Sequence, residues 1–137
     1  MGEPFAHQGL FVHGLIHLSP REALADIERG ALLVDVREDY MVAMKAFDVP
    51  NLQLLPFSRF QADFEELPRD RPLILADAVG LYSREAAAIL LARGYAEVAS
   101  LNGGISSWED DHLPLLVDPA NLLQGGCACQ LKPRREK

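Results

Sequence analysis

Residues 73–93, LILADAVGLYSREAAAILLAR, predict a strand, a loop and a helix in succession. The run from Leu73 to Ala76 is apolar without a break, which is typical of a short strand covered on both faces of a sheet. A helix is expected over 83–93, because Ala86, Ala87, Leu90 and Leu91 lie at helical spacing and Gly94 follows as a stop signal. A buried strand followed by a long helix is the unit from which parallel sheets are built.

The sequence on both sides of this unit alternates in the same way. Ser19, Pro20 and Glu22 form a helix start with a capping box, and Gly30 ends that helix. Further strands are predicted at 31–36, 52–55 and 98–101, and further helices at 38–47, from Ser58 to Pro68, and at 105–109, where Trp108 is expected in the core. The predicted fold is a single α/β domain with a parallel sheet of about four to five strands flanked by helices.

Length and charge limit the classes of function. A chain of 137 residues suits one domain, which we expect at 15–116, between a lead-in at 1–14 and a flexible, basic, cysteine-containing tail at 117–137. Residues 132–137 carry a net charge of +3 in a chain of net charge −7, so the remainder carries −10 and nucleic acid is not expected as a partner. No apolar run approaches the about 20 residues of a membrane span. Without a signal peptide pattern or a span, we expect a cytoplasmic protein with no membrane role.

The loop between the strand and the helix is the expected functional site, because open parallel sheets bind ligands beyond the carboxyl ends of their strands. Gly80 permits tight curvature, so that backbone amides can converge with the helix N-terminus into a cradle for an anion such as a thiolate, a persulfide or an oxyanion. The alternative is an ordinary strand-to-helix turn. The candidate cradle consists of Asp77, Ala78, Val79, Gly80, Leu81, Tyr82 and Ser83.

Further motifs give the chain a family resemblance. Residues 94–98 are Gly-Tyr-Ala-Glu-Val, residues 101–105 are Leu-Asn-Gly-Gly-Ile, Trp108 follows, and residues 35–38 are Asp-Val-Arg-Glu. In this order and at this spacing, the motifs resemble the closing and opening signatures of the rhodanese family, over about Leu15 to Leu115. The resemblance implies the rhodanese fold, and it implies sulfur transfer through a cysteine thiolate that accepts sulfur as a persulfide.

The loop departs from that resemblance at two positions. The family pattern is C-x-x-G-x-R-S, so Asp77 stands at the position of the nucleophilic cysteine and Tyr82 at that of an arginine that holds anionic substrate. A carboxylate cannot hold a transferable persulfide, and a tyrosine lacks the charge of the arginine. We therefore expect the loop to be inactive as a sulfurtransferase, with the Asp77 carboxylate accepting hydrogen bonds from the cradle amides.

The remaining polar residues are expected to support the structure of the site rather than to take part in a reaction. Asp35 and Arg37 match family positions that orient the loop, although an ion pair at the end of a strand explains them as well. The histidines lack the spacing of metal ligands. We expect no metal and no cofactor; the four histidines are His7, His13, His17 and His112.

Cys127 and Cys129, the only two cysteines, leave a second hypothesis open. Basic residues at 132–135 favour the thiolate form, and Gly125-Gly126 gives a flexible tether. The pair is interpreted as exposed thiols, as a sulfur carrier or redox pair, or as part of a metal site shared between chains. The predicted function is therefore a binding or regulatory module in sulfur handling, with an unidentified protein partner or sulfur donor. The alternative is a sulfurtransferase or persulfide carrier that uses these two thiols.

Overall fold

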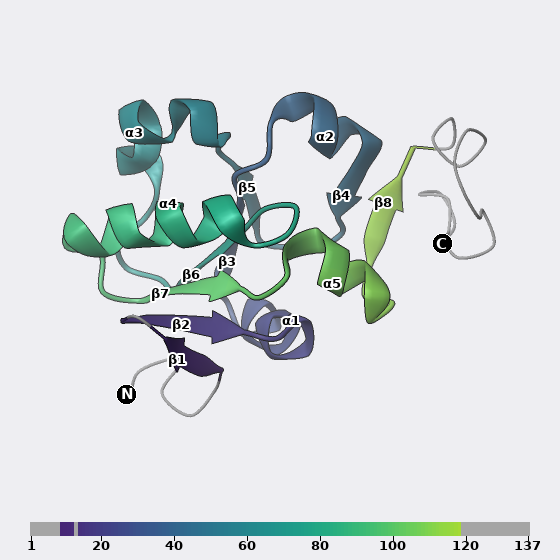
Figure 1. Cartoon of the computed structure of the whole chain (residues 1–137), viewed down its shortest axis with the longest axis horizontal. Helices are drawn as coiled ribbons and strands as arrows, with labels where there is room; N and C mark the ends of the chain where they lie inside the picture. The colour runs from purple at the N-terminus through teal and green to yellow at the C-terminus, as the bar shows by residue number, and fades with distance from the viewer. Residues whose placement is uncertain (1–8, 13, 119–137) are drawn as a thin grey trace.

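The computed structural model describes residues 9–12 and 14–118 (Figure 1), and strands alternate with helices along most of this range. The strands are β1 (Leu10–Val12), β2 (Leu15–Leu18), β3 (Leu32–Asp35), β4 (Lys45–Phe47), β5 (Leu52–Leu54), β6 (Leu73–Ala76), β7 (Val98–Leu101) and β8 (Leu115–Val117). The α-helices are α1 (Pro20–Glu28), α2 (Asp39–Met44), α3 (Phe60–Asp63), α4 (Leu81–Ala92) and α5 (Gly104–Asp110), and the 3-10 turns η1 (Phe57–Arg59) and η2 (Phe64–Glu66) flank α3.

Six strands form one sheet in the order β1-β2-β7-β6-β3-β5. Neighbouring strands are parallel except for β1 and β2, which are antiparallel. Strands β4 and β8 form a separate antiparallel pair. In Figure 1, α3 and α4 lie on one side of the sheet and α1 lies on the other. The predicted α/β architecture, with a mostly parallel sheet flanked by helices, is confirmed.

The central strand β6 shows why the apolar run at 73–76 has no interruption. All of its residues are buried. Leu73 and Leu75 belong to the core cluster that includes the apolar residues of α4, whereas Ile74 and Ala76 belong to the cluster on the other face, around Trp108. Successive strand residues face opposite sides, so a strand covered on both faces needs an apolar side chain at every position.

The start of α1 has the predicted capping box. The amide of Glu22 donates to Oγ of Ser19 at 3.2 Å, and the amide of Ser19 donates to Oε1 of Glu22 at 2.9 Å. The hydrogen bond from the Ser19 amide, with a smaller contribution from the amide of Gly9, holds the pKa of the Glu22 carboxyl below its ordinary value. Sequence alone therefore located this helix start correctly.

The sequence analysis did not predict four short strands, β1, β2, β4 and β8. The predicted helix at 38–47 ends at Met44 and continues as β4, and β8 lies across the expected boundary between the domain and the tail at 116. β1, β4 and β8 have three residues each and β2 has four, too few to show an alternating pattern, and all three residues of β1 are exposed. The segment expected as one helix between Ser58 and Pro68 is η1, α3 and η2 in succession.

Among the described residues, no helix has both the length and the apolar character needed to cross a membrane.

Candidate functional site

The loop after β6 lies at the carboxyl edge of the parallel strands. Asp35 at the end of β3 is in register with Ala76, and Ser100 of β7 is in register with Leu75. Asp77 therefore leaves the sheet between two neighbouring strands, at the edge where open parallel sheets bind ligands. It is 2% exposed, so protein groups rather than water surround its carboxylate.

The carboxylate of Asp77 accepts two backbone hydrogen bonds. Its Oδ1 accepts from the amide of Gly80 at 2.5 Å, and its Oδ2 accepts from the amide of Tyr82 at 2.7 Å. Gly80 has a φ of 104°, in the left-handed region, and this conformation turns the loop back over the carboxylate. The cradle amides thus hold the aspartate, as expected from the sequence. α4 starts at Leu81 rather than at the predicted Ser83, with Gly80 as its N-cap residue and the amide of Tyr82 bound to Asp77.

The turn before α5 forms the floor of the loop. The amide of Ile105 donates to the carbonyl oxygen of Asp77 at 2.9 Å, and the amide of Ser106 donates to that of Ala78 at 3.1 Å. A Cβ on Gly104, whose φ is 61°, would lie 2.6 Å from the carbonyl oxygen of Ala78 and would also collide with that of Asp77. Glycine is therefore required at 104 for the two backbones to approach this closely.

Two side-chain contacts fix the first turn of α4. The hydroxyls of Ser83 and Ser100 lie 3.1 Å apart, and both residues are buried. Nε of Arg84 donates to the carbonyl oxygen of Gly80 at 2.9 Å. Sequence analysis missed Ser100 and Arg84. The polar Ser100 inside an apolar strand was a usable signal, whereas nothing in the sequence distinguishes Arg84 from any other exposed helical arginine.

Asp35 and Arg37 form a buried ion pair at the end of β3. Nη2 of Arg37 donates to Oδ2 of Asp35 at 2.8 Å, and Nε donates to Oδ1 at 3.1 Å. The guanidinium carbon lies 5.6 Å from the centre of the Phe47 ring. The ion pair that was one of the two explanations for these residues is therefore present. The loop follows β6, which is the strand next to β3. A role of Asp35 and Arg37 in orienting the loop stays a prediction.

The outer face of the loop is apolar. Val79, Leu81 and Tyr82 are each more than half exposed, at 57%, 57% and 56%. The ring of Tyr82 packs on that of Phe57, with 5.0 Å between their centres. Sequence analysis missed Phe57, because it comes from η1 and no local pattern connects it with the loop. At the position where the family resemblance implies an arginine, the surface is aromatic.

The groups available for chemistry are limited. Cys127 and Cys129 are the only cysteines of the chain, and with His7 and His13 they lie outside the described residues. In the described part of the chain, no three side chains of His, Cys, Asp or Glu are grouped so as to hold a metal ion. Trp108 is fully buried and is a core residue, as predicted. The loop can therefore hold its own carboxylate, but it presents no thiol.

Comparison with known proteins places the chain in one family. A family model described as a rhodanese-like domain matches residues 19–111. The chain is 33% identical over 102 residues to a thiosulfate sulfurtransferase, GlpE, of Haemophilus influenzae, a match that covers 72% of this chain and 91% of the relative. It is 34% identical over 96 residues to a sulfurtransferase of Allochromatium vinosum, covering 70% of this chain and 87% of the relative.

A solved structure has the same fold. The rhodanese-related protein of Thermoplasma volcanium superposes with a TM-score of 0.66 at 22% identity, covering 74% of this chain and 98% of the other. The mostly parallel sheet, the loop after β6 and the glycine turn beneath it are thus found in a chain whose sequence matches sulfurtransferases over most of their length. The chain belongs to the family of rhodanese-like domains.

Proposed function

We propose that this rhodanese-like domain does not transfer sulfur at its loop and acts as a binding or regulatory module in sulfur handling. One observation carries the proposal: both carboxylate oxygens of Asp77 are bound by the amides of the loop, Gly80 through Oδ1 and Tyr82 through Oδ2. Transfer through a persulfide requires a thiolate at the centre of such a cradle. The carboxylate takes that place and satisfies the donors that would otherwise hold a thiolate, a persulfide or an oxyanion.

Electrostatics supports the same conclusion. Thiosulfate is an anion, and it would have to approach a buried carboxylate that already occupies the cradle. At an effective dielectric constant of about 20, two unit charges 4 Å apart repel by about 4 kcal/mol. The positive end of α4 is engaged with Asp77, so it does not offset this repulsion for a second anion. The loop is therefore expected to reject the substrate that the relatives' names describe.

The direct test is a thiosulfate:cyanide assay in which thiocyanate is measured. We expect no thiocyanate above background from the full chain, and the same result from the Cys127→Ser/Cys129→Ser double variant. The Asp77→Cys variant serves as the matched comparison, because it places a thiol at position 77 and changes no other residue of the loop. Turnover comparable with that of a cysteine-bearing rhodanese, retained in the double serine variant, would refute the proposed inactivity of the loop.

The alternative is that Cys127 or Cys129 carries sulfur while the domain presents it. Its support is the presence of these two thiols in a chain whose relatives are named sulfurtransferases. Incubation with a persulfide donor followed by mass spectrometry distinguishes the two hypotheses. A mass gain of one sulfur atom that disappears in the double serine variant, but persists in Asp77→Ala, would establish the carrier. No gain under conditions that load a control thiol would leave the binding module.

A further inference from the structure

We propose that the outer face of the loop binds an arginine side chain of a partner protein rather than an anion. The inference rests on the proposed function, since it states the chemistry of the partner that the module binds. The arginine would stack on the exposed ring of Tyr82, which packs on Phe57. The carboxylates of Glu38 and Glu85 would balance its charge.

The first observation is a row of aromatic rings that starts at the loop. Tyr82 lies 5.0 Å from Phe57, measured between ring centres. Phe57 lies 6.3 Å from Phe60, which lies 6.4 Å from Phe64, which in turn lies 6.5 Å from Tyr95. The row connects the start of α4 through η1, α3 and η2 to Tyr95, three residues beyond the far end of α4. Phe60, Phe64 and Tyr95 are buried, whereas Tyr82 is exposed.

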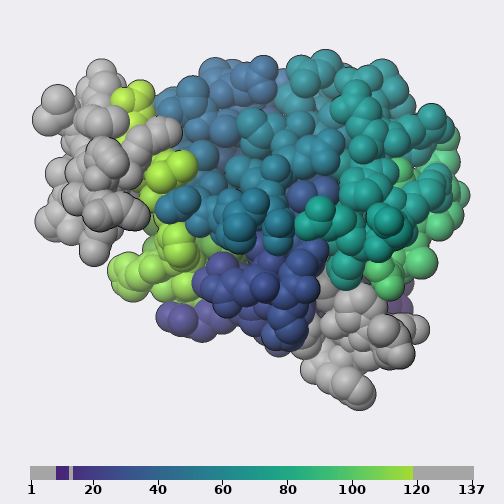
Figure 2. Space-filling view, turned by 180° about the vertical axis from the view of Figure 1, so that it is seen from behind, coloured from purple at the N-terminus to yellow at the C-terminus, as the bar shows by residue number. Residues whose placement is uncertain are grey.

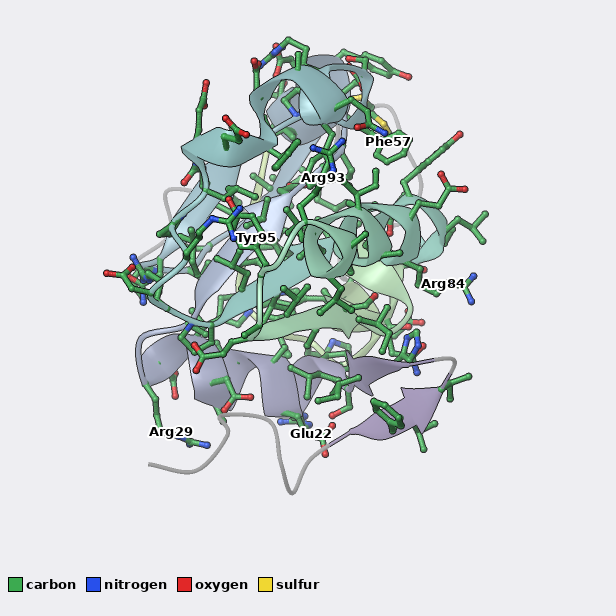
Figure 3. All side chains as sticks on the ribbon, turned by 90° about the vertical axis from the view of Figure 1, so that its left-hand side faces the viewer. Glu22, Arg29, Phe57, Arg84, Arg93 and Tyr95 are labelled. Carbon is green, nitrogen blue, oxygen red and sulfur yellow. The ribbon has the colours of Figure 1, made fainter. Side chains whose placement is uncertain are left out.

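The second observation is that arginines already cover the far end of this row. The guanidinium carbon of Arg93 lies 5.0 Å from the centre of the Phe64 ring, and that of Arg69 lies 4.1 Å from the centre of the Tyr95 ring. In Figure 3, Tyr95, Arg93 and Phe57 follow one another along this side of the molecule. Among the described residues, no guanidinium stacks on Tyr82. Tyr82, at the exposed end of the row, therefore lacks a stacked guanidinium such as those that cover Phe64 and Tyr95 at the other end.

The third observation is the charge beside the exposed rings. Glu38 accepts from the amide of Ser58 at 3.2 Å and from its hydroxyl at 2.9 Å, which holds the carboxylate next to Phe57 in the chain. Glu85 is exposed and follows Tyr82 by one helical turn, so the two side chains share a face of α4. On the face seen in Figure 2, the blue segments that contain α2 and η1 adjoin the teal segment that contains α4. One carboxylate is thus bound to the residue that follows Phe57, and another lies on the same face of α4 as Tyr82.

The chain's own described cations nearby are engaged elsewhere. Arg84 donates to the carbonyl oxygen of Gly80, and its position two residues after Tyr82 places it on the opposite side of the helix. Figure 3 shows Phe57 and Arg84 on opposite sides of the α4 ribbon. Arg59, on η1, lies 3.6 Å from a carboxylate oxygen of Asp63. Neither arginine is paired with Glu38 or Glu85.

These features select an arginine over the other common side chains. The negative face of an aromatic ring attracts a cation and repels an anion. A guanidinium is planar and weakly hydrated, so it stacks on a ring more readily than a lysine ammonium does. The apolar side chains of Val79 and Leu81, both exposed beside Tyr82, suit the aliphatic stem of the arginine and the apolar neighbours it would have in a partner segment.

The test uses the full chain, labelled with 15N, and the pentapeptide acetyl-Gly-Leu-Arg-Leu-Gly-amide as the probe. Kd is measured from amide shifts during titration. Matched peptides replace the arginine with citrulline, which keeps the shape without the charge, or with glutamate. Tyr82→Leu removes the ring, Tyr82→Phe keeps it, and Glu85→Gln removes one charge. Tyr40→Leu is the control, because Tyr40 is another exposed tyrosine, at 70%, on α2.

We expect the arginine peptide to shift the amides of 79–85, with a Kd at least about fivefold lower than that of the citrulline peptide, and no shift from the glutamate peptide. Tyr82→Leu should raise the Kd at least about fivefold, whereas Tyr82→Phe and Tyr40→Leu should leave it unchanged. Equal affinity for arginine and citrulline, or unchanged affinity in Tyr82→Leu, would overturn the proposal. So would the absence of any shift at millimolar peptide.

The assay also distinguishes this inference from the proposed inactivity of the loop and from binding of the chain's own arginines. Peptide titration does not depend on sulfur chemistry, so a failure here leaves the thiosulfate assay as the independent test of the inactive loop. The chain carries arginines of its own at 134 and 135. If Arg134→Gln/Arg135→Gln bound the arginine peptide more tightly than the unaltered chain, the site would belong to the chain's own tail, and the assignment to a partner would be wrong.

Discussion

Replacing Asp77 with alanine should destabilise the domain by about 3 kcal/mol. The substitution removes the acceptor of two charge-assisted hydrogen bonds, from Gly80 at 2.5 Å and from Tyr82 at 2.7 Å. Leaving a buried donor unpaired costs about 1–3 kcal/mol. The Gly80 bond is buried and the Tyr82 bond is partly buried, so water can replace the second acceptor more easily than the first. We therefore attribute most of the lost free energy of unfolding to the unpaired amide of Gly80.

Urea denaturation followed by circular dichroism measures this loss, and calorimetry should show a melting temperature lower by about 10 °C for a domain of this size. Asp77→Asn keeps one oxygen acceptor but turns an NH2 group toward the other amide, so its loss should lie between those of the unaltered chain and Asp77→Ala. Asp70→Ala is the control, since Asp70 is an exposed aspartate in a loop. If Asp77→Ala were within about 0.5 kcal/mol of the unaltered chain, the carboxylate would not hold the loop.

Three further results are expected. In a Cys127→Ser/Cys129→Ser background, Asp77→Cys should give a thiol whose pKa lies below the free value of about 8.5, measured by alkylation at several pH values; alkylation no faster than that of a model thiol at neutral pH would contradict the anion cradle. Gly104→Ala should lower the free energy of unfolding by about 2 kcal/mol or more in urea denaturation, because the new Cβ would meet the carbonyl oxygen of Ala78 at 2.6 Å. A loss of less than about 0.5 kcal/mol would show that the turn before α5 can move away from the loop. Glu22→Gln should lower stability by about 0.5–1 kcal/mol at pH 7. Because the folded pKa of Glu22 is lowered, its contribution is present above the unfolded pKa and is lost as pH falls through the folded pKa, so a difference that grew on acidification would contradict the capping box.

Sequence alone located the elements whose signals are local. The strand at 73–76 and the strand at 98–101 have the predicted bounds, because every residue of each is buried and each strand ends where a polar residue, Asp77 or Asn102, follows. The capping box at Ser19 was found because its partners lie within one turn. The expectation that Asp77 binds the cradle amides had the same local basis, since Gly80 and Tyr82 follow it within the loop.

Several of the features that sequence missed depend on contacts between distant segments. β4 and β8 exist because Lys45 pairs with Val117, and neither segment has a pattern of its own. The floor of the loop is a contact between Gly104 and Ala78 that no spacing rule connects. The aromatic row was missed for the same reason, because Phe57 and Tyr82 meet only when η1 folds onto the start of α4.

Tyr82 separates two layers of the site. Its backbone amide faces inward and binds Asp77, while its side chain faces outward and packs on Phe57. The inner layer consists of the Asp77 carboxylate, backbone amides and carbonyls, and Gly80 and Gly104, whose positive φ other residues rarely adopt. It therefore depends little on the identity of the outer side chains. The outer layer consists of exposed side chains that can change without disturbing the inner one. The proposed arginine site would therefore keep the rhodanese-like loop and change only the chemistry of the group that binds in front of it, from anionic to cationic.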